Sequence, residues 1–517
     1  MNAAMKGIML AAPIVLALLP WRSRADDAAH LEGMWKIDAA QYSFNPEGRS
    51  IPFTVAGRKR YQENMRLKAQ GKSDEYDYAK ARCASPGLPR LMITPERFRI
   101  WQRPGMVAIQ FEWNRLLRQI DLGGLIPQRR VGPAVTGLGG GADEEALVGR
   151  AIPISKGKWE GDTLVVTTEG FSGNTLVDEV VPHGYDMKLT ERIRLRDADT
   201  LEDRITIEDP EFFTRPWQTV VSYRRQPDAV FPESVCLDTL NLEFWPPGKG
   251  ARSPAVMATS RVGGAGLPDH DVDDRADMLA RGFAMARPPL PANAPQPSPD
   301  PRDFDGTWYH EDSLVFYIGV DMFGNPLPFT DEGRRVTQRR WDSIDKKGAP
   351  FIYASTYCIP TGQPLQFDLN MPFQVFQTRD HMNFTFEEYH GLWQISLDQN
   401  NVPAPGYMGP SVAHWDGNTL VVETKGFKEG FWLTGHGSSA SKDAKLTQRI
   451  RKVKSGDKWY LEMIYTLDDP TFYTHPWSWA RKYAWHPDMT LFKEYNCELS
   501  TGAKGGLDPS LVPEPQS

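Results

Sequence analysis

Apolar and polar residues alternate along most of this chain in short runs, and turn residues separate one run from the next. Residues 98–102 lead through Pro104 and Gly105 into residues 106–114, and the same pattern returns at residues 188–208. A period of two is typical of strands that bury one face, and close spacing of the runs favours antiparallel hairpins. The pattern therefore predicts a mainly β fold, closed as a barrel or folded as a sandwich.

Two segments break this alternation. Residues 55–69 and residues 331–344 lack the period of two and are dominated by charged residues that favour helix. Each segment predicts one short helix, so the expected unit is a β domain with a single helix.

The chain carries the same motifs twice. Residues 159–166 recur as residues 415–422, and residues 209–217 recur as residues 469–477, 256 and 260 positions further along. A repeat of this length is too long for one unit of a solenoid. The sequence therefore predicts two copies of one domain in tandem.

Composition places the boundaries between these copies. A stretch rich in proline, glycine, alanine and aspartate lies between them, and its second half is typical of a stiff, extended connector. The predicted segments are a signal peptide (1–25), a first β-barrel domain (26–246), a linker (247–302), a second β-barrel domain (303–508) and a flexible tail (509–517).

The N-terminal segment has the features of a secretory signal. Lys6 precedes the apolar residues 7–19, and small residues follow at Ser23 and Ala25. A run this short is typical of a cleaved signal rather than a membrane span, although an uncleaved anchor is the alternative. We expect the mature protein to be periplasmic or extracellular, without a transmembrane segment.

Charge and composition exclude some partners. The formal net charge is −7, from 59 basic and 66 acidic residues, and the chain contains no basic tract. Nucleic-acid-binding domains usually present such a tract, so no nucleic acid is expected as a partner. The 16 tryptophans either pack two aromatic cores or, in part, line a pocket.

The four cysteines fall at matching positions, Cys83 and Cys236 in the first copy and Cys358 and Cys497 in the second. Four cysteines allow three pairings, and pairing within each copy is the one that treats both copies alike. We therefore prefer the disulfides Cys83–Cys236 and Cys358–Cys497, which suit an exported protein. A zinc site is the alternative, but it would need thiols at short spacing, so no metal is predicted.

Short motifs in both copies resemble known families. Residues 33–35 (Gly-Met-Trp) and 306–308 (Gly-Thr-Trp) each open a β run, as Gly-x-Trp does in lipocalins and other calycin barrels. A more specific resemblance is to a family of exported bacterial tandem-repeat β proteins. The motifs that carry it are residues 83–89, 111–115, 159–166, 182–183 and 209–217, with Cys236 as the final cysteine.

This resemblance covers most of both copies and implies two calycin-like, mainly antiparallel barrels in an exported protein. It implies no activity, because we know of no established function for that family. The chain also departs from the family pattern, since Arg115 stands where a histidine is usual and Gly184 stands where a serine is usual.

The alternation predicts which side chains face the interior of a barrel, because every second residue of a strand points inward. In the second copy this set is Met382, Phe384, Phe386, Glu388 and His390. In the first copy it is Val107, Ile109, Phe111, Trp113 and Arg115.

Within these sets, Phe384, Phe386, Trp113 and Arg115 are candidate ligand-binding residues. Glu388 and His390 would place a carboxylate and an imidazole at one end of an aromatic-lined cavity, which suits acid–base catalysis. The alternative for this pair is a structural ion pair, or a strand end in solvent.

Three further residues are candidates. Glu191 shares the inward parity of its strand with Leu189 and Ile193, so it is a candidate interior acid, unless a neighbouring strand simply satisfies it. His183 and His436 occur in loops just before equivalent strands, where a base or a ligand clamp would sit at a barrel mouth. The alternative is that both are ordinary loop histidines.

We therefore expect an exported protein that binds small apolar or aromatic molecules in its barrels. The alternative is a cofactor-independent lyase, isomerase or hydratase, with Glu388 and His390 as the acid–base pair and His436 at the mouth. A purely structural role at the cell surface is a third possibility. The sequence has no dinucleotide, haem-attachment or serine-hydrolase motif, so no cofactor is predicted.

Overall fold

The computed structural model describes most of both repeats. The described ranges are 30–39, 50–77, 85–123, 150–173, 175–228, 294–310, 320–345, 361–369, 371–399, 406–427 and 440–492, with short stretches between them. The predicted signal peptide, the tail 509–517, all four cysteines and His436 lie outside the described residues.

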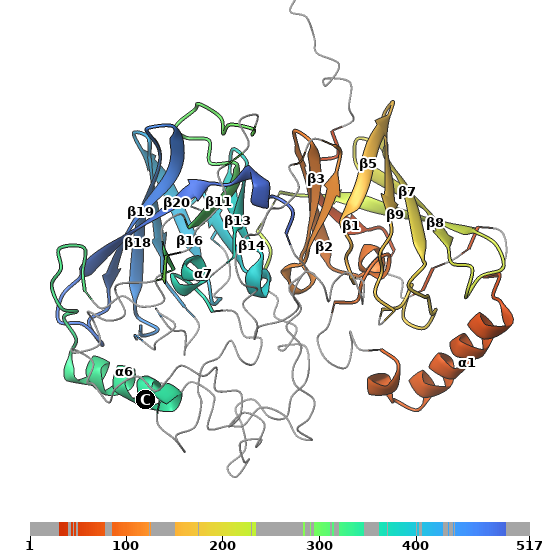
Figure 1. The fold of residues 1–517 in the computed structure, drawn as a ribbon, viewed down its shortest axis with the longest axis horizontal. Coiled ribbons are helices and arrows are strands. Elements are labelled where there is room, and N and C mark those ends of the chain that lie inside the picture. The colour runs from red at the N-terminus through yellow and green to blue at the C-terminus, as the bar shows by residue number, and fades with distance from the viewer. Residues whose placement is uncertain are drawn as a thin grey trace, which may run out of the picture.

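Two closed β-barrels of nine strands each stand in tandem along the chain, as the repeated pattern predicts (Figure 1). The strands of the first barrel are β1 (Gly33–Ile37), β2 (Arg97–Arg103), β3 (Met106–Phe111), β4 (Leu117–Asp121), β5 (Ser155–Glu160), β6 (Thr163–Thr168), β7 (Lys188–Asp197), β8 (Thr200–Glu208) and β9 (Trp217–Gln226). Pairing of β1 with β9 closes this barrel.

The second barrel repeats the arrangement. Its strands are β11 (Gly306–His310), β13 (Phe373–Gln377), β14 (His381–Phe386), β15 (Leu392–Ser396), β16 (Ser411–Asp416), β17 (Thr419–Thr424), β18 (Lys445–Ser455), β19 (Lys458–Asp468) and β20 (Trp477–Trp485). Pairing of β11 with β20 closes it. A separate two-stranded pair is formed by β10 (Phe283–Ala284) and β12 (Ser313–Leu314).

One pairing in each barrel differs from the antiparallel order that the sequence predicts. Strands β4 and β5 are parallel, and so are their counterparts β15 and β16. Parallel neighbours need a connection of about a dozen residues or more. The chain has that length between Asp121 and Ser155 and between Ser396 and Ser411.

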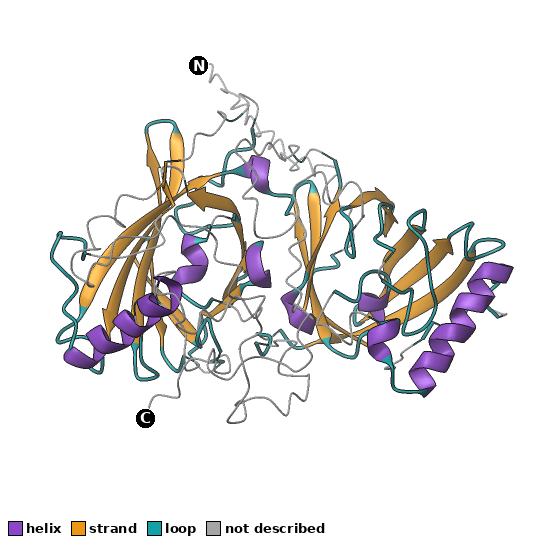
Figure 2. Cartoon of the chain, turned by 60° about the horizontal axis from the view of Figure 1, so that its bottom comes forward, coloured by secondary structure: helices purple, strands orange, loops and turns teal. Residues whose placement is uncertain are grey.

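The two predicted helices are present as α1 (Val55–Ala69) and α6 (Asp331–Asp345). Figures 1 and 2 show each of them at the same end of its barrel. A further single-turn helix, α7 (Leu365–Asp368), and short 3-10 turns complete the helical elements among the described residues.

Both long helices begin with the same cap. The Thr54 hydroxyl accepts a hydrogen bond from the Gly57 amide at 3.0 Å, and Thr330 does the same for Gly333 at 3.1 Å. Such a cap satisfies an amide that the first helical turn leaves unpaired. A Cβ atom on Gly57 would lie 2.2 Å from the Phe212 carbonyl oxygen, so only glycine lets the helix approach that loop.

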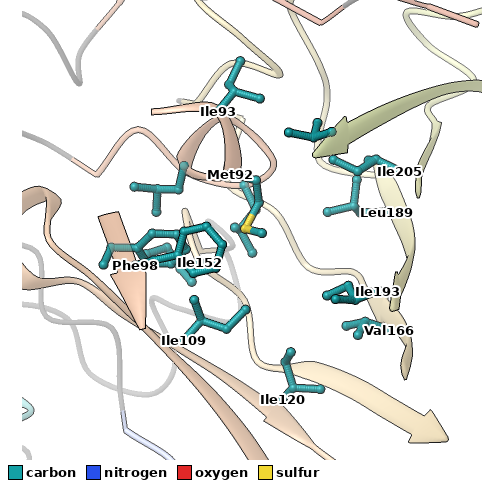
Figure 3. Packing of buried hydrophobic residues seen from close by; sticks show 14 of the residues in the cluster. Met92, Ile93, Phe98, Ile109, Ile120, Ile152, Val166, Leu189, Ile193 and Ile205 are labelled. Carbon is teal, nitrogen blue, oxygen red and sulfur yellow. The ribbon is translucent and has the colours of Figure 1, made fainter. Parts of the chain in front are cut away.

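Each barrel interior is an apolar core. Figure 3 shows that side chains from several strands of the first barrel point toward one another, with Met92 from a 3-10 turn among them. Trp35 and Trp308, from the two Gly-x-Trp motifs, are fully buried, and each donates its indole N–H to a carbonyl four residues earlier. Trp217 and Trp477, the last residues of the repeated segments 209–217 and 469–477, are also buried.

The barrels pack against each other through the same strands of each repeat. Figure 1 shows β2 and β3 of one barrel beside β13 and β14 of the other. Trp101 stacks on Phe376, its own counterpart, with ring centroids 5.3 Å apart. An interface in which equivalent residues meet is the intramolecular form of a two-fold symmetric dimer contact.

Other contacts of this interface come in symmetric pairs. Gln119 accepts a hydrogen bond from the Phe492 amide at 2.7 Å, and Gln394 accepts one from the Phe231 amide at 2.7 Å. Gln119 and Gln394 occupy the same position of β4 and β15. The two repeats therefore bury the outer faces of these strands against each other.

Candidate functional site

The interior of the first barrel contains a cluster of ionisable side chains. Its members are Arg118 on β4, Glu191 on β7, Asp203 on β8 and Tyr223 on β9. Each lies on the inward face of its strand, beside residues of the apolar core, and each is 0% exposed. Ionisable groups are costly to bury, so a cluster like this marks a candidate functional site.

Arg118 and Glu191 form an ion pair across the barrel. Arg118 Nη1 lies 2.8 Å from one carboxylate oxygen of Glu191, and Nη2 contacts the other oxygen. Nη2 also lies 3.3 Å from the Ser155 hydroxyl and 3.4 Å from the Thr168 hydroxyl. Glu191 is therefore an interior acid, as its parity predicts, and a neighbouring strand satisfies its charge.

Asp203 has no such partner. Neither of its carboxyl oxygens accepts a hydrogen bond from a donor among the described residues. Burial raises the pKa of Asp203 well above its usual range, and the neighbouring Glu191 carboxylate raises it further. The two carboxyl groups form a hydrogen bond only if a proton lies between them, so Asp203 is the protonated member.

Tyr223 completes the cluster. Its hydroxyl donates to the main-chain carbonyl of Met92 at 3.0 Å, and burial raises its pKa well above the usual range. Tyr223 is therefore neutral, and the Arg118 cation balances the Glu191 anion. The site holds one carboxyl group more than it holds cations.

The second barrel carries different residues at these positions. Strand register places Trp393 at the position of Arg118, Gln448 at that of Glu191 and Met463 at that of Asp203. All three ionisable groups are therefore replaced together. Only the tyrosine is kept, as Tyr483.

Neutral groups make the equivalent hydrogen bonds in the second barrel. The Trp393 indole N–H donates to Ser411 at 2.7 Å, where Arg118 reaches Ser155 in the first barrel. Gln448 donates to the side chain of Gln363 at 2.9 Å. The interior around them is aromatic, and Phe367 alone contacts six other aromatic rings.

The second barrel has a buried ion pair of its own, at different positions. Arg481 on β20 holds Asp368 of α7 through two hydrogen bonds, of 2.8 and 3.2 Å. Here one cation meets one carboxylate in a bidentate pair, which satisfies both groups. Among the described residues, an interior carboxyl group without a donor, that of Asp203, occurs in the first barrel and not in the second.

Phe384 and Phe386 lie in the core of the second barrel, as predicted, and Val107, Ile109 and Phe111 lie in that of the first. The predicted alternation stops after these residues. Strand β14 ends at Phe386, and β3 ends at Phe111.

Glu388 and His390 therefore do not continue the inward face of a strand, which corrects the parity argument. They lie in a 3-10 turn, Glu388–His390, in which Tyr389 and His390 have positive φ angles of 55° and 47°. Trp113 and Arg115 lie in the equivalent turn, Trp113–Arg115, of the first repeat. Left-handed residues reverse the chain, so side-chain parity is lost.

These turns meet between the barrels. Arg115 Nε donates to the main-chain carbonyl of His390 at 3.0 Å, and Glu388 accepts a hydrogen bond from Gln366 through its own main-chain carbonyl. Trp113 packs against the first core. Arg115 and His390 thus belong to the interface, while Phe384, Phe386 and Glu191 lie inside the barrels.

A cavity lies beside this interface. Residues from both repeats line it, among them Arg115, Arg150, Thr385, Glu387, His390 and Phe492. Its volume is about 40 Å³. Such a volume holds a few water molecules, whereas pockets for organic ligands have volumes of about 300 Å³ or more.

His183 is a buried loop residue. Its Nδ1 donates to the Gly184 carbonyl at 2.9 Å, and Nε2 accepts a hydrogen bond from the Thr175 hydroxyl at 2.8 Å. Burial lowers its pKa, so the ring is neutral. The equivalent position in the second repeat is Ala440, because Gly184 and Ser441 donate to equivalent aspartates, Asp209 and Asp469.

Sequence reasoning missed Arg118, Asp203 and Tyr223. A signal was available for Asp203, which shares its parity with Leu201, Ile205 and Ile207. The stronger signal is the joint replacement of Arg118, Glu191 and Asp203 between repeats, but strand register is needed to align those positions.

No protein-family model, curated protein or solved structure matches the chain. The structure itself shows the tandem barrels. The resemblance to an exported bacterial family stays a prediction from sequence motifs. Within the described ranges, no helix has the length and apolar character to span a bilayer, and no three potential ligand residues gather as a metal site.

Proposed function

We propose that this is an exported protein that binds small apolar or aromatic molecules inside its barrels. The observation that carries the proposal is the buried cluster around Asp203. Its carboxyl group faces an apolar interior and lacks a donor among the described residues. Binding sites for small molecules combine apolar walls with a few polar groups that fix the ligand's orientation.

The two interiors support different ligands within this class. The first offers a protonated carboxyl group and an ion pair among aliphatic and aromatic side chains. The second offers aromatic walls that include Phe384, Phe386 and Trp393, with neutral hydrogen-bonding groups. Aromatic walls favour flat, apolar molecules through stacking and edge contacts.

Titration with N-phenyl-1-naphthylamine, an uncharged dye that fluoresces in apolar surroundings, tests the proposal. We expect saturable binding to the full chain. Val166→Phe fills the first interior, Val422→Phe fills the second, and each is expected to reduce the number of bound dye molecules. Lys158→Phe, on the outer face of β5, is the matched control and should leave binding unchanged.

Circular dichroism of each variant establishes that it folds. Dye binding that neither interior substitution changes would place the dye outside the barrels and contradict the proposal. Mass spectrometry of small molecules that co-purify with the protein then identifies candidate natural ligands, and cell fractionation tests export.

A second candidate is a cofactor-independent lyase, isomerase or hydratase. One observation favours it: Arg118 binds Glu191, whereas the neighbouring Asp203 carboxyl group lacks a donor among the described residues and burial raises its pKa. Environments that separate two acids in this way are typical of acid–base catalysis. Turnover of a bound ligand that Asp203→Asn abolishes, while binding persists, would favour the enzyme over the binding protein.

A further inference from the structure

We propose that the first barrel selects ligands with a positively charged amine, attached to an apolar or aromatic body. This inference rests on the proposed function and specifies the ligand class of the same site. The observation behind it is the charge inventory of the interior: one arginine faces two carboxyl groups, and both oxygens of Asp203 lack a donor among the described residues.

The groups that surround Asp203 come from four strands. On β7, Glu191 and Ile193 lie beside it, and on β9, Val221 and Tyr223 do. Arg118 from β4 is the cation of the cluster, and it already binds both oxygens of Glu191. Glu202 on β8 points to the outer face, where it pairs with Arg194.

An ammonium group at Asp203 would complete this inventory. It would supply N–H donors to the two oxygens that lack them, and its charge would balance a second carboxylate. A neutral alcohol would donate one hydrogen bond and leave Asp203 protonated. A carboxylate ligand would bring a third acid against a single arginine, which strongly disfavours it.

The second barrel offers an internal comparison. It has Met463 in place of Asp203, and its own acid, Asp368, is already held in a bidentate pair by Arg481. Its interior therefore has no unmatched carboxyl group among the described residues. We expect it to bind amines no better than alcohols of the same shape.

Amine binding at Asp203 exchanges one proton. The ligand enters from water as an ammonium ion, Asp203 loses its proton to the solvent, and the bound state contains ammonium and carboxylate. One proton is therefore released for each amine that binds. The affinity for the amine then rises with pH by about tenfold per unit while Asp203 of the free protein is protonated.

The test is isothermal titration calorimetry of the full chain with three matched probes: 2-phenylethylammonium, 2-phenylethanol and 3-phenylpropanoate. At pH 8 we expect the amine to bind at least about tenfold more tightly than the alcohol. We expect 3-phenylpropanoate to bind most weakly. Titrations in phosphate and in Tris, whose ionisation enthalpies differ, should show proton release with the amine only, over the pH range in which Asp203 of the free protein is protonated.

Two variants assign the preference to one residue. Asp203→Asn should bring the affinities of the amine and the alcohol to within about threefold of each other and abolish proton release. Glu202→Gln, on the same strand but on the outer face, should retain the preference for the amine. Should Asp203→Asn fail to fold, proton release and the pH dependence of the unmodified protein decide the question.

The outcomes separate this inference from the proposed function. If the alcohol binds as tightly as the amine and no proton is released, the amine preference is wrong while small-molecule binding stands. If Asp203→Asn retains the preference, the cation is bound elsewhere and the inference is also wrong. If neither these probes nor the naphthylamine dye binds, both proposals fail.

Discussion

The Thr385 hydroxyl donates a hydrogen bond of 3.0 Å to the side-chain carbonyl of Gln110, the residue that occupies its own position in the other repeat. Such a contact arises only close to a two-fold axis. Trp101 with Phe376 and Arg115 with His390 repeat the relationship along the same interface. The two barrels therefore pack as a symmetric dimer does, although one chain supplies both halves.

Symmetry predicts equal effects for substitutions at equivalent interface positions. Gln119→Ala and Gln394→Ala each remove hydrogen bonds that link one barrel to a loop of the other repeat. Leaving those buried groups unpaired is expected to cost about 1–3 kcal/mol in either variant. Denaturant unfolding measures this, and a loss confined to one of the two variants would contradict the symmetric arrangement.

Two glycines, each in the first turn of a long helix, lie too close to a neighbouring loop to carry a side chain without a clash. A Cβ atom would lie 2.2 Å from the Phe212 carbonyl oxygen at Gly57, and 2.3 Å from that of Phe472 at Gly333. Because both obstacles are main-chain atoms, Gly57→Ala and Gly333→Ala are each expected to cost about 1–3 kcal/mol. Val55→Ala, at an exposed position of the same turn, is the control and should change stability by less than about 0.5 kcal/mol. Thermal unfolding of these three variants checks the expectation.

Stability should fall in mild acid because of His381. Burial, followed by the Arg99 guanidinium, lowers the pKa of His381 to about 4, while Asp228 and Asp380 oppose this effect. The unfolded chain takes up a proton near pH 6.5 that the folded chain accepts only near pH 4. The contribution is therefore complete above pH 6.5 and is lost as the pH falls toward 4, by at most about 1.4 kcal/mol per unit.

His381→Met supplies the comparison, because Met106 occupies the equivalent position in the first repeat. Denaturant unfolding at several pH values between 4 and 8 should show a weaker pH dependence for this variant. An unchanged pH dependence would mean that another group controls the acid sensitivity.

For Asp203 we expect the opposite dependence of stability on pH. Its folded pKa lies above the ordinary value, so its stabilising contribution is complete in acid and is lost as the pH rises. Asp203→Asn removes this group and should make the protein more stable at pH 8, with a gain that shrinks toward pH 4.

Asp368→Asn is the matched substitution in the second barrel. It leaves Arg481 buried without its carboxylate, so we expect a loss of about 3–5 kcal/mol. Thermal unfolding of both variants compares them, and similar losses at both sites would show that Asp203 is paired as well as Asp368.

The local pattern of apolar and polar residues was enough to predict the elements that face solvent on one side. Strand β8 alternates strictly between buried and partly exposed residues after Leu201, and α1 spans the residues that the sequence predicts. Strands β3 and β14 behave differently, since all six residues of each are buried. The outward residues Gln110 and Thr385 have the polar character of solvent-facing positions, yet they meet each other.

The repeats, the two helices and the tandem β domains were determined by the sequence itself, because period and turn chemistry are local properties of the chain. Barrel closure, the parallel pairs and the partners of Asp203 were decided only by the tertiary structure. The alternation of side chains along a strand predicts that a residue points inward. The groups that meet inside the barrel, however, come from strands far apart in sequence. The two-fold packing of the barrels then buries a second face, and on those strands the polar pattern no longer distinguishes an interface from a surface.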